Sequence, residues 1–127
     1  MEAVITPLKR LIDRTERGDD SMEELQARLL SFACREEGFD EERFLHEKAI
    51  EFERRDRART FLVSTREHHL LGFFSLAMEP LEIHGVNPSV RKKITAGNKN
   101  ADRCAAFLIG QLAKSKDCEK RFRQFFA

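Results

Sequence analysis

Four histidines are the side chains of this sequence best suited to acid–base or metal chemistry. His68 and His69 adjoin in a polar turn, His46 falls on the charged side of an expected helix, and His84 follows an apolar run. None stands in an H-x-x-x-H pattern or beside a carboxylate at ligand spacing. The sequence therefore predicts no metal site, and simple solvent exposure explains these side chains.

Nucleophilic chemistry has equally little support. Cys34, Cys104 and Cys118 are odd in number and far apart, and they form no C-x-x-C pair, so neither a disulfide framework nor a zinc site is indicated. No serine stands in a G-x-S-x-G elbow. Free cysteines of this kind favour a reducing, cytoplasmic location, and no apolar window reaches the ~18 residues of a membrane span.

Phosphate recognition is the remaining class of chemistry to consider. The sequence lacks both G-x-G-x-x-G and G-x-x-x-x-G-K-[ST], the backbone cradles for nucleotides. Its C-terminal third is basic, with ten bases against three acids over residues 91–127, densest at Arg91–Lys93 with Lys99 and Arg103. Such a cluster could bind a nucleic acid or an acidic partner, but without interleaved aromatics a solvated surface is the favoured interpretation.

The elements that must position any site begin with three helices in one domain, residues 1–127. The first starts near Pro7. The second starts at Ser21 and Glu24, a capping-box pair. The third follows Gly38, with Asp40 as its cap, and runs through EERFLHEKAIEFERRDRA; residues 31–34 could extend the second helix or form a strand. The apolar side of the third helix carries Phe44, Leu45, the stem of Lys48, Ala49 and Phe52.

A β-rich half follows. Residues 58–65 and 70–83 predict two strands joined in a hairpin, with a bulge or close approach at Gly72 and a bend imposed by Pro80. Residues 84–103 form a polar excursion with one helical turn near 89–94. Phe107 to Leu112 then predicts a buried strand, and Phe122, Phe125 and Phe126 could line a terminal helix.

The order of four segments resembles a known family. The segments are SFACREEGFDEERFLHEKAIEFE, RTFLVSTREHHLLGFFSLAMEPLEI, a polar excursion with RKKI, and AAFLIGQLAKSKD. Over about residues 31–117 they resemble the N-terminal half of GNAT-type N-acetyltransferases, in particular the small bacterial and phage-borne branch that includes acetyltransferase toxins. The matching residues are Phe32 and Cys34, Phe44 and Leu45, Thr60 to Leu62, and Gly72 to Ala77.

The resemblance implies an α/β (α+β) fold: a partial, mixed or antiparallel GNAT-like sheet flanked by N-terminal helices and lacking the later strands. It implies acetyl-CoA as cosubstrate, held by the backbone of Gln111, Leu112, Ala113 and Lys114, and transfer of its acetyl group to an amine. The family's pyrophosphate loop would come next, but Ser115 to Lys120 contain no glycine. We therefore expect a truncated domain with impaired transfer, or no enzyme at all; the catalytic residues and the amine acceptor stay unassigned.

The alternative is a non-enzymatic interaction module. Without later strands, FLIGQLA would be an unpaired apolar edge and could join two copies into a homodimer unless CEKRFRQFFA covers it. The basic C-terminal third leaves a third option, binding of tRNA or another nucleic acid, which would weaken steeply with salt.

Overall fold

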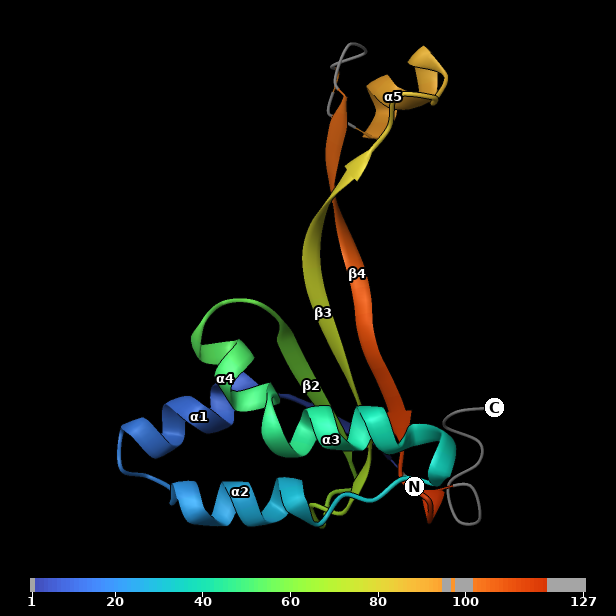
Figure 1. Cartoon of the computed structure of the whole chain (residues 1–127). Helices are drawn as coiled ribbons and strands as arrows, with labels where there is room; N and C mark the ends of the chain where they lie inside the picture. The colour runs from blue at the N-terminus through green and yellow to red at the C-terminus, as the bar shows by residue number, and fades with distance from the viewer. Residues whose placement is uncertain (1, 95–96, 98–101, 119–127) are drawn as a thin grey trace. The chain divides into compact units, whose positions relative to one another are not determined.

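The computed structural model describes residues 2–94, 97 and 102–118, which form helices and one antiparallel sheet (Figure 1). Contacts within this chain divide it into two compact units, residues 1–76 with 109–127 and residues 77–108. The elements in order are β1 (Val4–Pro7), α1 (Leu8–Glu16), α2 (Met22–Leu30), the 3-10 turn η1 (Glu36–Gly38), α3 (Phe39–Glu47), α4 (Ala49–Arg54), β2 (Arg59–Ser64), β3 (Leu70–Glu82), α5 (Pro88–Ile94) and β4 (Arg103–Lys114).

The sheet has the strand order β1-β2-β3-β4, which confirms the α/β class with an antiparallel sheet beside N-terminal helices. The predicted hairpin is β2 and β3. Its register has one irregularity, because Val63 lies opposite Gly72 while Ser64 lies opposite Leu70. Leu71 is thus the extra residue of a β-bulge, next to the glycine at which the sequence indicated a bulge.

The bulge changes which residues of β3 share a face of the sheet. Leu70 joins the main core on the helix side, with Leu62 and Phe73, whereas Leu71 packs with Cys118 on the other side. In a regular strand, Leu71 and Phe73 would share a face and Leu70 would lie on the opposite one. The bulge therefore lets Leu70 and Phe73 be buried on the same side of the sheet.

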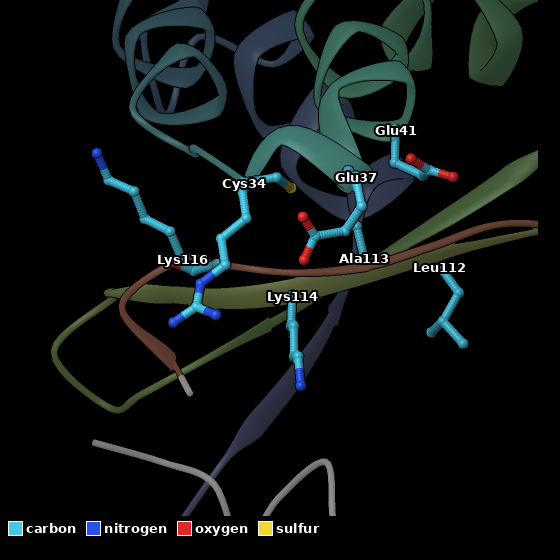
Figure 2. A pocket seen from close by; sticks show the side chains of 10 residues that line it. Cys34, Glu37, Glu41, Leu112, Ala113, Lys114 and Lys116 are labelled. Carbon is cyan, nitrogen blue, oxygen red and sulfur yellow. The ribbon is translucent and has the colours of Figure 1, made fainter. Parts of the chain in front are cut away.

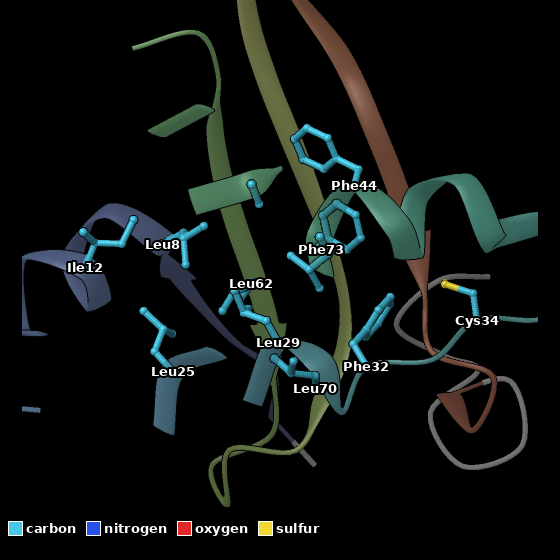
Figure 3. Packing of buried hydrophobic residues seen from close by; sticks show 12 residues of the cluster. Leu8, Ile12, Leu25, Leu29, Phe32, Cys34, Phe44, Leu62, Leu70 and Phe73 are labelled. Carbon is cyan, nitrogen blue, oxygen red and sulfur yellow. The ribbon is translucent and has the colours of Figure 1, made fainter. Parts of the chain in front are cut away.

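The main core forms where the four N-terminal helices meet one face of the sheet (Figure 3). The Phe73 ring is central to it, with the Phe32 ring edge-on at 5.6 Å and the Phe44 ring stacked at 6.2 Å between centroids. Because Phe32 precedes α3 and Phe44 lies within it, these contacts fasten both segments to β3. The helical residues of the core are Leu8, Ile12, Leu25, Leu29, Phe44, Leu45 and Ala49.

The N-cap half of the predicted capping box is confirmed, since the Ser21 hydroxyl accepts the Glu24 N–H at 3.4 Å. Residues 31–34 neither extend α2 nor form a strand. Ser31 is the C-cap of α2, and an extended segment without strand pairing follows.

The single third helix of the prediction is wrong, because the chain breaks at Lys48 (φ −124°, ψ −24°) into α3 and α4. Apolar spacing cannot show this break, since Phe44 and Ala49 stay buried on either side of it. Asp40 is not the cap either; it lies in the first turn, after the N-cap residue Gly38. Glycine is required there, since a Cβ would come within 2.8 Å of the Cys34 Cβ.

The buried Glu53 carboxylate joins α4 to β2. Its Oε1 accepts the Thr60 N–H at 2.7 Å, and its Oε2 accepts from the Arg59 guanidinium at 2.7 Å. Arg59 also bonds Asp56 at 2.5 Å, and the hydrogen bonds to Glu53 and then to Asp56 raise the pKa of Arg59. The charged pattern of this helix suggested solvated faces, and it gave no sign that one carboxylate would be 4% exposed.

Strand β4 is a strand as predicted but not a buried one. Phe107, Leu108, Ile109 and Leu112 are between 54% and 73% exposed. Because successive side chains of a strand point to opposite faces, the exposure of Phe107, Leu108 and Ile109 means that neither face of this stretch is covered by the described residues. The strand is also the last of the sheet, with β3 on one side and no further strand among the described residues on the other. Residues 119–127, where the terminal helix was predicted, lie outside the described residues.

Strand β3 continues past Pro80 to Glu82, where the sequence predicted difficulty for a central strand unless it bends. Its pairing with β2 ends at Leu76, which lies opposite Arg59. Beyond that point no strand among the described residues pairs with this side of β3, so a proline without an N–H is tolerated. In the second unit, Ile83 N–H donates to Asp102 O at 2.9 Å, and α5 confirms the predicted helical turn.

The Glu53 carboxylate generates a stability prediction. Replacing Glu53 by Ala leaves the buried Thr60 N–H without its acceptor, and we expect a loss of about 2–3 kcal/mol in the free energy of unfolding, measured by urea denaturation. The matched control is Glu51→Ala in the same helix, because Glu51 is 53% exposed and pairs only with Arg55 at 3.2 Å. That variant should change stability by less than about 0.5 kcal/mol; equal losses in the two variants would contradict the role of Glu53.

Candidate functional site

The predicted binding residues lie at the end of β4, beside a pocket of about 180 Å³ (Figure 2). Leu112, Ala113 and Lys114 line this pocket, whereas Gln111 is not among its lining residues. Its opposite wall comes from the segment before α3 and from the first turn of that helix. The lining residues outside β4 are Cys34, Arg35, Glu37, Gly38, Glu41, Ser115 and Lys116.

Two backbone hydrogen bonds fix which way β4 faces here. The Ser115 N–H donates inward to Leu71 O at 2.7 Å, and the Lys116 N–H donates to Ala33 O at 2.9 Å on the other side. Because backbone groups alternate along a strand, those of Gln111 and Ala113 point toward β3, and those of Leu112 and Lys114 point away from it. The outer edge of β4 therefore meets the pocket at Leu112.

The wall opposite β4 is held by hydrogen bonds to the backbone of residues 32–34. The Cys34 N–H donates to Glu42 Oε1 at 2.8 Å, and His46 Nε2 lies 2.8 Å from Phe32 O. His46 was expected on the solvated side of its helix; it is instead half-buried and fastens this segment to α3. Sequence spacing could not show these contacts, because they depend on how the chain turns at Gly38.

Charges of both signs surround the pocket. The lining includes the carboxylates of Glu37 and Glu41 and three cationic residues, Arg35, Lys114 and Lys116. Glu41 Oε2 is buried and has no hydrogen-bond partner among the described residues, so it can accept a proton or an ammonium group. The mixture suits a polar ligand with both donors and acceptors.

Cys34 is unsuited to act as a nucleophile. Burial, followed by the nearby Glu42, Glu41 and Glu37 carboxylates, raises the pKa of its thiol to about 11. Because the thiolate is the reactive form, Cys34 stays protonated and inert near neutral pH. The site therefore offers the backbone edge of β4, the carboxylate of Glu41 and the wall formed by the segment before α3.

The turn after β4 is the position at which the family resemblance implies a pyrophosphate-binding loop. Its four N–H groups all have acceptors: those of Ser115 and Lys116 as described, that of Asp117 on Ser115 Oγ at 3.2 Å, and that of Cys118 on Ser115 O at 3.0 Å. A phosphate cradle needs such groups free and convergent. Residues 115–118 therefore offer no backbone donors to a phosphate.

The other residues considered from the sequence are not brought to this site. His68 and His69 lie in the exposed turn between β2 and β3. His84 contacts Glu82 at 2.7 Å and Asp102 at 3.3 Å, a grouping that the sequence does not show because Asp102 comes from a distant segment. No group of three potential metal ligands is found in residues 2–94, 97 and 102–118.

The basic cluster is partly engaged in local structure. Arg91 donates to the carbonyl oxygens of His84 and Val86, at 2.8 and 3.0 Å, and Arg103 pairs with Glu82 at 2.6 Å. Lys99 lies outside the described residues. Among the helices that the structure describes, none is long and apolar enough to cross a membrane.

Comparison with known proteins gives the fold but not the family. No protein-family model matches the chain, and no curated protein matches it in sequence. The chain is similar to a solved structure of AtaT complexed with acetyl-methionyl-tRNAfMet, at 21% identity and a TM-score of 0.62, over 94% of this chain and 61% of AtaT. The fold is thus GNAT-like, and the chain spans about three-fifths of the length of that structure.

The raised thiol pKa predicts slow modification of Cys34. With a pKa of about 11 in place of 9.0, its thiolate fraction at pH 8 is about 100-fold lower than that of an ordinary thiol. Iodoacetamide should label the half-buried Cys104 first, and labelling of Cys34 should rise steadily toward pH 11, as followed by site-resolved mass spectrometry. Fast labelling of Cys34 at pH 7 in the folded protein would contradict this assignment.

Proposed function

We propose that the chain is an N-acetyltransferase-like domain that binds acetyl-CoA along the outer edge of β4, with an amine as acceptor. The observation that carries the proposal is the outward-facing backbone of Leu112 beside the 180 Å³ pocket. The GNAT-like fold supports it, because the resemblance assigns this strand to the cofactor.

In the proposed binding mode, the pantetheine arm of acetyl-CoA lies along β4 as an added strand would. The amide groups of that arm alternate with the backbone groups of an edge, so donors and acceptors can pair in register. Of the four residues from Gln111 to Lys114, Leu112 and Lys114 have N–H and C=O groups that point away from β3; Leu112 has the main role, because Lys114 makes another interaction within the chain. Gln111 and Ala113 support the edge through their pairing with β3.

When bound, acetyl-CoA would supply an acetyl group activated as a thioester. The chain's own contribution is to hold the reactants in place and to receive charge. Glu41 is the residue of this pocket suited to hold a cationic amine or to accept its proton, since one of its oxygens lacks a partner among the described residues. The amine itself is unassigned; because AtaT was solved with acetyl-methionyl-tRNAfMet, an aminoacyl-tRNA is one acceptor to test.

We expect the chain to bind the pyrophosphate of acetyl-CoA only weakly. The N–H groups of residues 115–118 are already bonded within the chain, so the described residues after β4 would add little affinity for the pyrophosphate. The exposed Lys116 leaves only a solvated charge there. We infer that the pantetheine arm provides most of the binding and that transfer is impaired.

Calorimetry tests this proposal directly. Acetyl-CoA and acetyl-pantetheine, which lacks the nucleotide and its phosphates, should bind with affinities within about tenfold of each other, a difference below about 1.4 kcal/mol. A much larger preference for acetyl-CoA would show that the phosphates are held after all. Absence of saturable binding by both ligands would overturn the proposed function.

Two substitutions of Leu112 separate the contribution of its backbone N–H to binding from that of its side chain. Leu112→Pro removes the outward N–H without taking a donor from the β3 pairing, so the strand should survive and the affinity should fall about tenfold, as for a lost hydrogen bond. Leu112→Ala keeps that N–H and is the matched control. Equal affinities of the two variants for acetyl-pantetheine would argue against binding along the edge.

Self-association is a second candidate function, favoured by the exposure of Ile109 at 61% and Leu112 at 64% on an edge strand. No charged residue stands between Ala105 and Ala113 in β4, so nothing there opposes pairing with the same strand of a second copy.

A sedimentation experiment tests the second candidate. The wild type should show a concentration-dependent dimer, and Leu112→Lys should shift it toward the monomer by placing like charges at the paired edge. Lys116→Leu, outside β4, is the control that should leave the dimer intact. A wild type that stays monomeric at high micromolar concentration would contradict self-association.

A further inference from the structure

A second and larger pocket, of about 570 Å³, lies between α1, α2 and the turn that joins β2 to β3. It shares no lining residue with the pocket beside β4. Leu11 and Leu25 contribute apolar wall, and Arg28 and His68 contribute polar groups. Its volume falls in the range of pockets for small organic ligands.

Arg28 is the anomalous residue of this pocket. Its Nε is buried from solvent and has no hydrogen-bond partner among the described residues. Burial also lowers the pKa of the Arg28 guanidinium, although an arginine keeps its charge in a protein. An unpaired buried donor on a charged group is costly, so an acceptor from outside the described chain would stabilise it.

The nearby charges do not neutralise Arg28. Asp20 is taken by Arg14, with 2.5 Å between Nε and Oδ2, and Asp19 is taken by Arg17 at 3.1 Å. Glu24 precedes Arg28 by one helical turn, yet it is exposed and no ion pair joins the two. Of the two arginines that line this pocket, Arg14 is thus paired, whereas Arg28, in the last turn of α2, has no ion pair among the described residues.

His68 supplies a second polar group at the mouth of the pocket. It lies at the turn with a left-handed backbone, φ 69°, a conformation that is uncommon for a residue other than glycine. The imidazole can donate a hydrogen bond to an anion in this pocket. One partly buried guanidinium, one imidazole and two leucines together match an anionic head with an apolar body.

We propose that this pocket binds a small phosphomonoester, with its phosphate on the Arg28 guanidinium and its organic part against Leu11 and Leu25. A guanidinium suits phosphate because its planar fork donates two parallel hydrogen bonds. This site is independent of acetyl-CoA and of the proposed acetyl transfer.

Nuclear magnetic resonance of the arginine side chains tests the site. Phenyl phosphate is titrated into the ¹⁵N-labelled protein, and the Nε–H resonances are followed. One resonance, identified as Arg28 by its absence from Arg28→Lys, should shift saturably. Phenol, which lacks the phosphate, should leave it in place, and inorganic phosphate should bind more weakly than phenyl phosphate.

Substitutions on the two helices sharpen the result. Arg28→Lys should weaken phenyl phosphate binding at least about tenfold, the loss expected for one bidentate charged contact. Arg17→Lys is the control and should bind as the wild type does, since Arg17 is 61% exposed and already paired. Glu24→Gln should strengthen binding, because it removes a carboxylate that lines the pocket and forms no ion pair among the described residues.

Three results would overturn the proposal. They are a uniform, unsaturated drift of all the arginine resonances, an Arg28→Lys variant that binds phenyl phosphate as well as the wild type, and a response to phenol that equals the response to phenyl phosphate. Each can be read from the folded protein, whose backbone spectrum reports any unfolding of a variant.

Discussion

The contact on which the rest of the structure depends is the aromatic cluster around Phe73. This one ring on β3 touches Phe32, which precedes α3, and Phe44, which lies within α3. The cluster thereby holds the segment of Cys34 and Gly38 at a fixed height over the sheet. Together with the hydrogen bonds of residues 32–34, it positions the wall of the pocket opposite the outer edge of β4.

The sequence indicated most of the elements because their signals are local. Ser21 with Glu24 marked a helix start, and the β-branched and aromatic runs before and after His68 marked the hairpin. What it could not show depends on distant partners. The burial of Glu53 requires the N–H of Thr60, and the exposure of Leu112 requires knowing that no described strand pairs beyond β4.

At the candidate site, too, the sequence indicated local features but not those that depend on distant partners. Gln111 to Lys114 were singled out through a resemblance, and the structure brings three of these four residues to a pocket. The alternation of the strand then separates Leu112 from its neighbours, a distinction that follows from the bonds of Ser115 and Lys116. Arg28 carries no motif at all, because the lack of a partner is a property of three-dimensional packing.

The bulge at Leu71 has a consequence for how this chain can change in length. It shifts the alternation of side chains along β3 by one residue, so that Leu70 and Phe73, three residues apart, face the same side of the sheet. Deleting one residue there would exchange the two faces of every side chain on one side of the cut. Insertions and deletions in the turn that precedes the bulge have no such effect, so natural or engineered length variation should accumulate between Thr65 and His69 and avoid Leu70 to Phe73.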